Sequence, residues 1–211
     1  RTIRGREGMY RRALRILDLA GDVRGVGSEG SFRCGDLTWD RLNGRMVLRG
    51  EPVVTEPDRV LQARRIEYET EARRGTAIGD VRVLLFPDSV RAYGERSEYD
   101  ERTGRSVLTG EPRLVIPGGP GESGMTVRAD TLVLRESDRS GEAIGRVRIV
   151  RGNLRTISRP ADFRLEQNRI LLTGEPVAWD LDGDIRADTM SVRVRERKAD
   201  QLRAWGAVQV R

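Results

Sequence analysis

The chain has 211 residues, of which 37% are hydrophobic and 34% are charged, and its mean hydropathy is -0.55. It contains 39 basic and 33 acidic residues, no histidine and a single cysteine, Cys34. These counts exclude an internal disulfide, and they remove the usual general base, the Ser-His-Asp arrangement and most zinc sites. No run approaches the ~18–20 apolar residues of a membrane-spanning helix. We therefore expect a protein that is not an enzyme and that uses no cofactor and no metal.

The first segment is the one place where a helix competes with a strand. Residues 9–19 fit a short amphipathic turn, but Leu17 and Leu19, followed by Gly21 and Val23, also fit an extended strand. We favour the strand. Residues 1–13 are expected to form an N-terminal extension, either flexible or ordered. Residues 14–211 are expected to form a single domain built of repeats of about 60 residues.

Two sequence markers recur in a fixed order along the chain. Gly-Glu-Pro occurs at 50–52, 110–112 and 174–176, at steps of 60 and 64 residues. A Gly-x-Val element interleaves with it, beginning at Gly21, Gly79, Gly145 and Gly206. Ordered recurrence of this kind indicates one structural unit used repeatedly. Because proline has no amide hydrogen to donate, we predict that each Gly-Glu-Pro marks a corner of the sheet and not a reactive site.

Between the markers, apolar and charged residues alternate, as in 81–83, 147–149 and 192–194. This period of two is typical of strands with one apolar face. The segments 61–68, 127–134 and 185–192 each slip by one position, which predicts a bulge where a strand passes from one sheet to the other. The expected fold is all-β: an elongated two-sheet β-jellyroll or solenoid-like, V-shaped sandwich of repeated antiparallel strands. Residues 117–124 are its one flexible insertion.

The apolar phase of these strands predicts which side chains face the interior. The candidates for a groove between the sheets are Val81, Val83, Leu85, Leu132, Leu134, Val147, Ile149, Met190, Val192, Val194 and Val208. The terminal strands, 14–24 and 203–210, are candidate edges for pairing with another chain. Their assembly residues would be Leu17, Leu19, Val23, Trp205, Val208 and Val210. Arg148, Arg151, Arg193 and Arg195 lie either at the groove mouth, holding lipid phosphates, or on an outward face with carboxylate partners.

The ordered motifs resemble the lipopolysaccharide-transport family with the OstA-like β-jellyroll domain, the type of LptA, LptC and the N-terminal domain of LptD. The resemblance lies in Ala129-Asp130-Thr131-Leu132, Ala187-Asp188-Thr189-Met190 and the run from Leu172 to Val177. The opening, residues 17–40, is similar to LptC. The resemblance covers residues 14–211.

That resemblance implies a V-shaped jellyroll whose groove holds acyl chains, in a periplasmic protein of the bacterial envelope that transfers lipid towards the outer membrane. It implies lipopolysaccharide or a similar lipid as ligand, and other Lpt-type β-jellyrolls as partners through edge-strand pairing, with head-to-tail homo-oligomers as a further option. An anchor would lie in a segment outside this chain.

Two other functions stay open on the residues alone. A structural β-solenoid with a filled core would assemble by its ends and bind no lipid, and the apolar pattern fits a closed core as well as an open groove. A nucleic-acid-binding protein is suggested only by the net charge of +6. It would need aromatic residues on a basic face, and the aromatic residues here are scattered, so we expect no nucleic-acid partner.

Overall fold

The computed structural model describes residues 2–121, 123–135, 140–164, 169–195 and 198–211, and in these ranges the chain is all strand and turn, without a helix. All strand pairs are antiparallel, so the expected all-β, antiparallel architecture is confirmed. In chain order the strands are β1 (Thr2–Arg4), β2 (Glu7–Arg11), β3 (Ile16–Val26), β4 (Ser31–Asp40), β5 (Arg45–Arg49), β6 (Val53–Thr55), β7 (Arg59–Gln62), β8 (Arg65–Glu69), β9 (Arg74–Leu85), β10 (Val90–Asp100), β11 (Arg105–Thr109) and β12 (Arg113–Ile116). The second half contains β13 (Met125–Arg128), β14 (Thr131–Arg135), β15 (Ser140–Ile144), β16 (Val147–Arg151), β17 (Leu154–Ser158), β18 (Ala161–Arg164), β19 (Arg169–Thr173), β20 (Val177–Trp179), β21 (Asp184–Arg186), β22 (Thr189–Arg195), β23 (Lys198–Trp205) and β24 (Gln209–Val210).

The pairings divide these strands into two ladders that run the length of the molecule. Sheet 1 runs in the order β2, β3, β4, β5, β8, β9, β10, β11, β14, β15, β18, β19, β22, β23. Sheet 2 runs β1, β3, β4, β6, β7, β9, β10, β12, β13, β16, β17, β20, β21, β24. The long strands β3, β4, β9 and β10 belong to both ladders, one half to each, so the two sheets are one ribbon folded along its length.

The Gly-Glu-Pro elements are corners of this fold, as predicted. Their glycines have φ near +75°, +75° and +71°, and each following glutamate is also left-handed, which turns the backbone from one sheet towards the other. After each corner, the proline carbonyl accepts a hydrogen bond from the alanine amide of the neighbouring crossing. The pairs are Ala63 with Pro52, Ala129 with Pro112 and Ala187 with Pro176, at 3.3, 3.4 and 3.3 Å.

The Gly-x-Val elements are corners of a second kind. Gly79 and Asp80 are both left-handed, and the Gly79 carbonyl accepts a hydrogen bond of 2.9 Å from the Arg64 amide. In the next repeat, the Asp130 amide donates to the Ile144 carbonyl at 3.0 Å, beside Gly145. The slips predicted at 61–68, 127–134 and 185–192 lie at these same crossings, between β7 and β8, β13 and β14, and β21 and β22. Sequence and structure therefore agree on where the ribbon folds.

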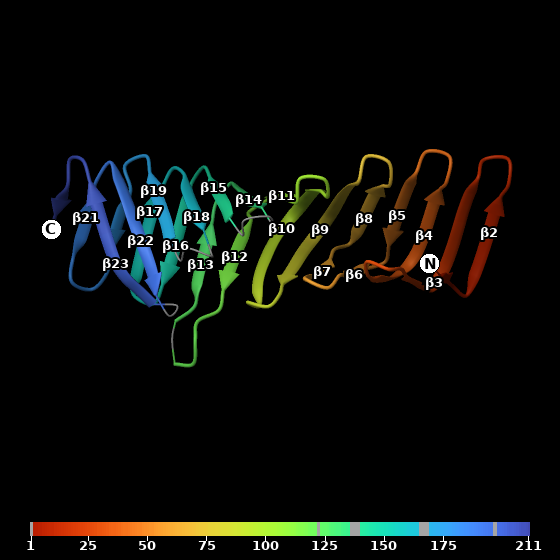
Figure 1. Ribbon diagram of the computed structural model, residues 1–211, viewed down its shortest axis with the longest axis horizontal. Coiled ribbons are helices and arrows are strands. Elements are labelled where there is room, and N and C mark those ends of the chain that lie inside the picture. The colour runs from red at the N-terminus through yellow and green to blue at the C-terminus, as the bar shows by residue number, and fades with distance from the viewer. Residues whose placement is uncertain (1, 122, 136–139, 165–168, 196–197) are drawn as a thin grey trace.

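The corners and turns form three separate lines along the molecule. The corners form one line, which we call the apex. The described turns of sheet 1 form a second line, rim 1, and those of sheet 2 form a third, rim 2. Figure 1 shows strands running between two rows of turns along the long axis. Among the described residues, no backbone hydrogen bond joins rim 1 to rim 2. In this part of the chain, the space between the sheets, which we call the trough, is therefore closed by backbone hydrogen bonds at the apex and not at the rims.

The molecule is elongated, with the first and last strands at opposite ends (Figure 1). Its accessible surface is 12859 Å², whereas a compact monomer of 23.7 kDa would expose roughly 9,800 Å². An extended ribbon explains the excess, because each repeat contacts only its neighbours along the axis. In the ranges described, there is no helix with the length and apolar character needed to cross a bilayer.

The N-terminal end differs from the expectation. Residues 2–4 and 7–11 form β1 and β2, which pair with the two halves of β3. The domain therefore begins before residue 14, and the N-terminal edge consists of β1 and β2 instead of residues 14–24. The strand expected over 14–24 is present as β3, shifted by two residues, and the expected insertion at 117–124 falls in the connection between β12 and β13.

Candidate functional site

The interior of the trough holds two apolar clusters, one in each half of the chain. The first cluster runs from Val23 to Val81 and contains Cys34, Leu37, Leu48, Ala63, Ile66 and Ala77. The second is larger and runs from Val90 to Val192. Val83 packs against both, so the clusters meet at β9. The apolar interior therefore continues from one half of the chain into the other, and it is more extensive in the C-terminal half.

Burial in the trough decreases from the apex towards the rims. On β14, Leu132 is fully buried, whereas Leu134, two residues nearer rim 1, is only partly buried. On β16, the exposed fraction rises from 1% at Val147 to 7% at Ile149, and Arg151 beyond them is half-buried. Burial on these two strands therefore decreases with distance from the apex.

The structure places most of the predicted groove residues inside the trough. Val81, Leu132, Val147, Ile149, Met190 and Val192 are buried, and Val83, Leu85 and Leu134 pack against the clusters at their margins. The side chain of Val194 lies outside the described residues. Trp39 and Trp179 are half-buried and Trp205 is exposed.

Two placements need correction. Val208 is 49% exposed, because β24 is the last strand of sheet 2 and nothing covers it. Val23 was expected on an assembly edge, but it is fully buried in the first cluster, because β1 and β4 flank β3 on both sides. The other expected assembly residues fall into two groups. Leu17 and Leu19 are half-buried on β3, which pairs with β2, whereas Trp205 and Val210 are exposed at the C-terminal end.

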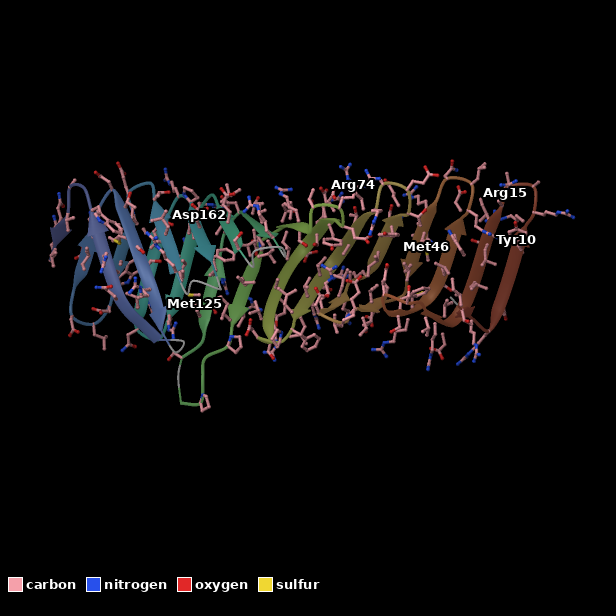
Figure 2. All side chains as sticks on the ribbon, viewed as in Figure 1. Tyr10, Arg15, Met46, Arg74, Met125 and Asp162 are labelled. Atoms are coloured by element: carbon pink, nitrogen blue, oxygen red, sulfur yellow. The ribbon has the colours of Figure 1, made fainter. Side chains whose placement is uncertain are left out.

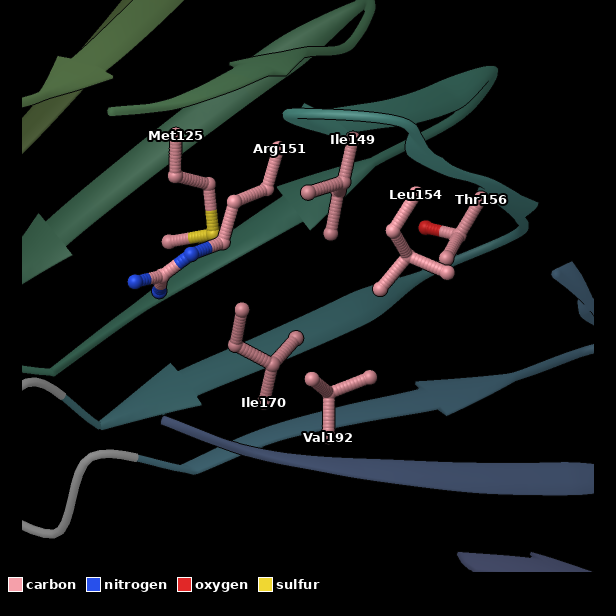
Figure 3. Close-up of a pocket in the computed structure, with 7 residues that line it drawn as sticks. All are labelled: Met125, Ile149, Arg151, Leu154, Thr156, Ile170 and Val192. Carbon is pink, nitrogen blue, oxygen red and sulfur yellow. The ribbon is translucent and has the colours of Figure 1, made fainter. Parts of the chain in front are cut away.

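A recess opens between the sheets in the C-terminal half (Figure 3). One wall comes from β13, β16 and β17 of sheet 2, and the other from β19 and β22 of sheet 1. The recess spans about 300 Å³ of space continuous with solvent, and its lining residues are Met125, Ile149, Arg151, Leu154, Thr156, Ile170 and Val192. Its enclosed part has room for roughly one water molecule. The two walls thus nearly touch, and a larger guest would have to part them.

Two lining residues are polar. Arg151 ends β16 at rim 2 and brings a positive charge to the mouth of the recess. Thr156 lies deeper, on β17 between β16 and β20, and is 3% exposed. Its Oγ1 makes no hydrogen bond. Figure 3 shows this oxygen turned towards the neighbouring Leu154 side chain. Sequence reasoning selected Arg151 but missed Thr156, which shares the inward phase of Leu154.

A polar clamp crosses the trough near the middle of the molecule. Arg59, from β7 of sheet 2, places its guanidinium 4.1 Å from the ring centre of Tyr99, from β10 of sheet 1. Arg59 also forms an ion pair of 2.5 Å with Glu56 at rim 2, and its side chain is only 14% exposed. A cation over an aromatic face is stabilising when it is shielded from water. The clamp therefore joins the two rims between the apolar clusters.

Rim 1 carries a hydrogen-bond network beside this clamp. The Tyr68 hydroxyl donates to Glu101 Oε2 at 2.6 Å, and the Arg73 guanidinium donates to the other carboxylate oxygen of Glu101. Arg73, followed by Tyr68, lowers the pKa of Glu101. Burial, followed by the hydrogen bond to Glu101, raises the pKa of Tyr68 to about 12. In the sequence, segment 61–68 was predicted only to slip from one sheet to the other, and no polar role was expected for Tyr68.

Many charged side chains are exposed, and Figure 2 shows nitrogen and oxygen atoms at the tips of side chains that project from the outside of the ribbon. Arg148 and Arg193 are exposed there, which agrees with the outward position of the second alternative, while the side chain of Arg195 lies outside the described residues. The directly paired residues are not the expected carboxylates: Arg128 and Ile157 lie beside Arg148, and Arg169 and Gln201 lie beside Arg193. At the corners, Arg64 pairs with Asp80 at 2.5 Å, and in the next repeat Asp130 pairs with Arg146 at 2.9 Å, with the two charges exchanged. These exposed pairs contribute little to stability individually.

Metal-ligating side chains and the single cysteine were two further candidates for a reactive site. No group of three or more potential metal ligands occurs among the described residues. Cys34 is buried in the first cluster, and this burial raises the pKa of its thiol to about 11, so it remains protonated at neutral pH. Residues 180–184 resemble a calcium loop at first sight. Residues 180–183 form the turn between β20 and β21, and Asp184 is the first residue of β21.

No protein-family model matches the chain, and no curated protein matches it by sequence. Among solved structures, it aligns with the crystal structure of LptH from Pseudomonas aeruginosa, described as the LptA-homologous periplasmic component of the conserved lipopolysaccharide transport device. The alignment covers 96% of this chain and 97% of that chain, with 10% identity and a TM-score of 0.24.

Proposed function

We propose that this protein is a non-enzymatic lipid-binding and transfer protein of the bacterial periplasm. Its ligand is an acylated lipid such as lipopolysaccharide, held in the trough and passed towards the outer membrane. The observation that carries the proposal is the burial gradient: a largely apolar inner face that, in the described residues, is closed by backbone at the apex and becomes less buried towards the rims. The sequence resemblance to the OstA-like β-jellyroll points to the same function.

The C-terminal half is the section we assign to the acyl chain. It contains the larger apolar cluster and the recess, and it lies beyond the polar clamp of Arg59 and Tyr99. Each buried methylene contributes about 0.8 kcal/mol, so a chain of ordinary length is held without directed hydrogen bonds. The narrow recess means that the sheets must separate at the rims when lipid enters, with the apex as the hinge.

The ends of the ribbon are the proposed contacts with other proteins. At the N-terminal end, Met9 and Tyr10 on β2 are 63% and 50% exposed. At the C-terminal end, Trp205 and Val210 are 44% and 71% exposed. Unpaired strand edges with exposed apolar side chains accept a further strand. Pairing of one end with the opposite end of another β-jellyroll, or of a second copy, would extend the trough from protein to protein.

Native mass spectrometry of the gently purified chain tests this function. The proposal predicts a mass shift equal to a bound acylated lipid, which is lost in the Val192→Arg variant because that change places a charge in the recess. The matched control is Ile157→Arg, since Ile157 is 40% exposed on the other face of sheet 2. Absence of bound lipid after incubation with lipopolysaccharide and with phospholipid would contradict the proposal.

A second function, a self-assembling structural ribbon with a filled interior, is favoured by one observation, the near contact of the recess walls. It predicts concentration-dependent filaments in the same spectra, with no lipid in any of them. Lipid-loaded monomers or short oligomers would exclude it.

A further inference from the structure

One buried polar group in the trough lacks a partner. Thr156 is 3% exposed, yet its Oγ1 neither donates nor accepts a hydrogen bond. Most buried hydroxyls in folded proteins are hydrogen-bonded, because burying one without a partner is costly. The next inward residue on the same strand obeys that rule: the Ser158 hydroxyl donates to the Pro160 carbonyl at 2.9 Å. Thr156 is therefore an exception within its own strand.

A resident water does not account for this hydroxyl. A buried water needs two to four polar partners, and the wall around Thr156 is formed by apolar side chains, including Ile149, Leu154 and Ile170. The other polar lining residue is Arg151, which pairs with Leu154 across β16 and β17. This pair lies two residue positions nearer rim 2 than the pair of Ile149 and Thr156. The site thus offers one hydroxyl deep in an apolar channel and one cation at its mouth.

We propose that Thr156 is a polar subsite of the trough, at which its hydroxyl donates a hydrogen bond to the carbonyl oxygen at the head of an acyl chain. The occupant is an ester- or amide-linked acyl chain of an anionic lipid. Its hydrocarbon lies along the trough, and its headgroup faces rim 2, where the charge of Arg151 complements it. This inference rests on the proposed function and adds to it a fixed position for the acyl chain.

The test compares two synthetic probes: phosphatidic acid with ester-linked chains, and its ether-linked analogue with chains of the same length. The ether probe keeps the hydrocarbon and the phosphate but lacks the carbonyls. Competition for the whole chain, read by native mass spectrometry, should favour the ester probe about three- to tenfold, the value of one hydrogen bond. In Thr156→Val that preference disappears, while the ether probe binds as before.

Three further variants separate the subsite from general effects. Thr156→Ser retains a hydroxyl and should keep the preference. Thr126→Val, on β13 of the same sheet but in the opposite phase from Met125 and Val127, should keep it too. Thr156→Val is expected to melt at or above the wild-type temperature, because it removes an unpaired buried hydroxyl. If it does not fold, Thr156→Ala provides the same comparison.

The possible results divide clearly. Loss of the ester preference in Thr156→Val alone supports the subsite. Equal binding of both probes by the wild type overturns the subsite and leaves lipid binding intact. Binding of neither probe overturns the proposed function itself, and the subsite with it.

Discussion

At the scale of single residues, the fold depends on glycines that turn the ribbon at the apex. Gly110 has φ of +75°, and a Cβ added there would lie 2.5 Å from Cβ of Glu95. Gly121, in the loop between β12 and β13, has the same φ but open space around it. A comparison of the two positions therefore separates the cost of a left-handed backbone from the cost of steric crowding.

We predict that Gly110→Ala lowers the free energy of unfolding by more than Gly121→Ala. Both variants incur the cost of a left-handed alanine, about 1–2 kcal/mol, if the loop cannot relax. Gly110→Ala also forces the corner away from Glu95, whereas Gly121→Ala meets no atom. Urea denaturation of the two variants measures the difference. Equal midpoints would show that the corner tolerates a shift and does not fix the fold.

The titration of Tyr68 tests the network at rim 1. Its pKa is raised to about 12 in the folded protein, first by burial and then by the hydrogen bond to Glu101. A raised folded pKa stabilises the protein below the unfolded value of about 10, and this contribution is lost as the pH rises through 12. Absorbance titration should show a tyrosinate step near pH 12 that Tyr68→Phe removes and Tyr10→Phe leaves in place. A step that survives Tyr68→Phe would contradict the network.

Residues differ in how far the sequence reveals them. The corners were predictable, because Gly allows a left-handed backbone, Pro has no amide hydrogen to donate, and both recur at fixed spacing. The clamp was not, because Arg59 and Tyr99 lie on different sheets and meet only when the ribbon has folded. Thr156 carries no pattern that distinguishes its hydroxyl from a satisfied one. Its significance depends on partners that only coordinates reveal.

At the scale of the strands, the inner face has two zones, a packed floor at the apex and a partly exposed margin at the rims. Alternation in the sequence predicted which residues face inward. It could not predict the gradient, because Leu132 and Leu134 are identical in type and phase. Their difference arises from distance to the apex.

This gradient makes a prediction for two leucines on one strand. Leu132→Ala should lower the free energy of unfolding by about 2–5 kcal/mol, the cost of a cavity at a fully buried site. Leu134→Ala should cost less than half of that, because the site is partly open to solvent. Chemical denaturation measures both. Equal losses would mean that the interior is a uniformly closed core.

At the scale of the whole molecule, the chain is a folded ribbon with apolar ends and a polar clamp between two apolar sections. The repeated markers predicted an elongated molecule, and the repeated slips by one position predicted its two sheets. The extra strands β1 and β2 escaped prediction, because their sequences, TIR and EGMYR, carry no marker and β2 is exposed throughout. Terminal strands have one neighbour per sheet, so burial imposes little pattern on them.

Site-specific photo-crosslinking in cells tests the central claim, that lipid occupies the space between the sheets. Ile149 and Val150 are adjacent on β16, but Ile149 is 7% exposed inside the trough and Val150 is 41% exposed on the outer face. The account predicts lipid adducts from a crosslinker at 149 and none at 150. Adducts at neither position, or equal labelling at both, would contradict it.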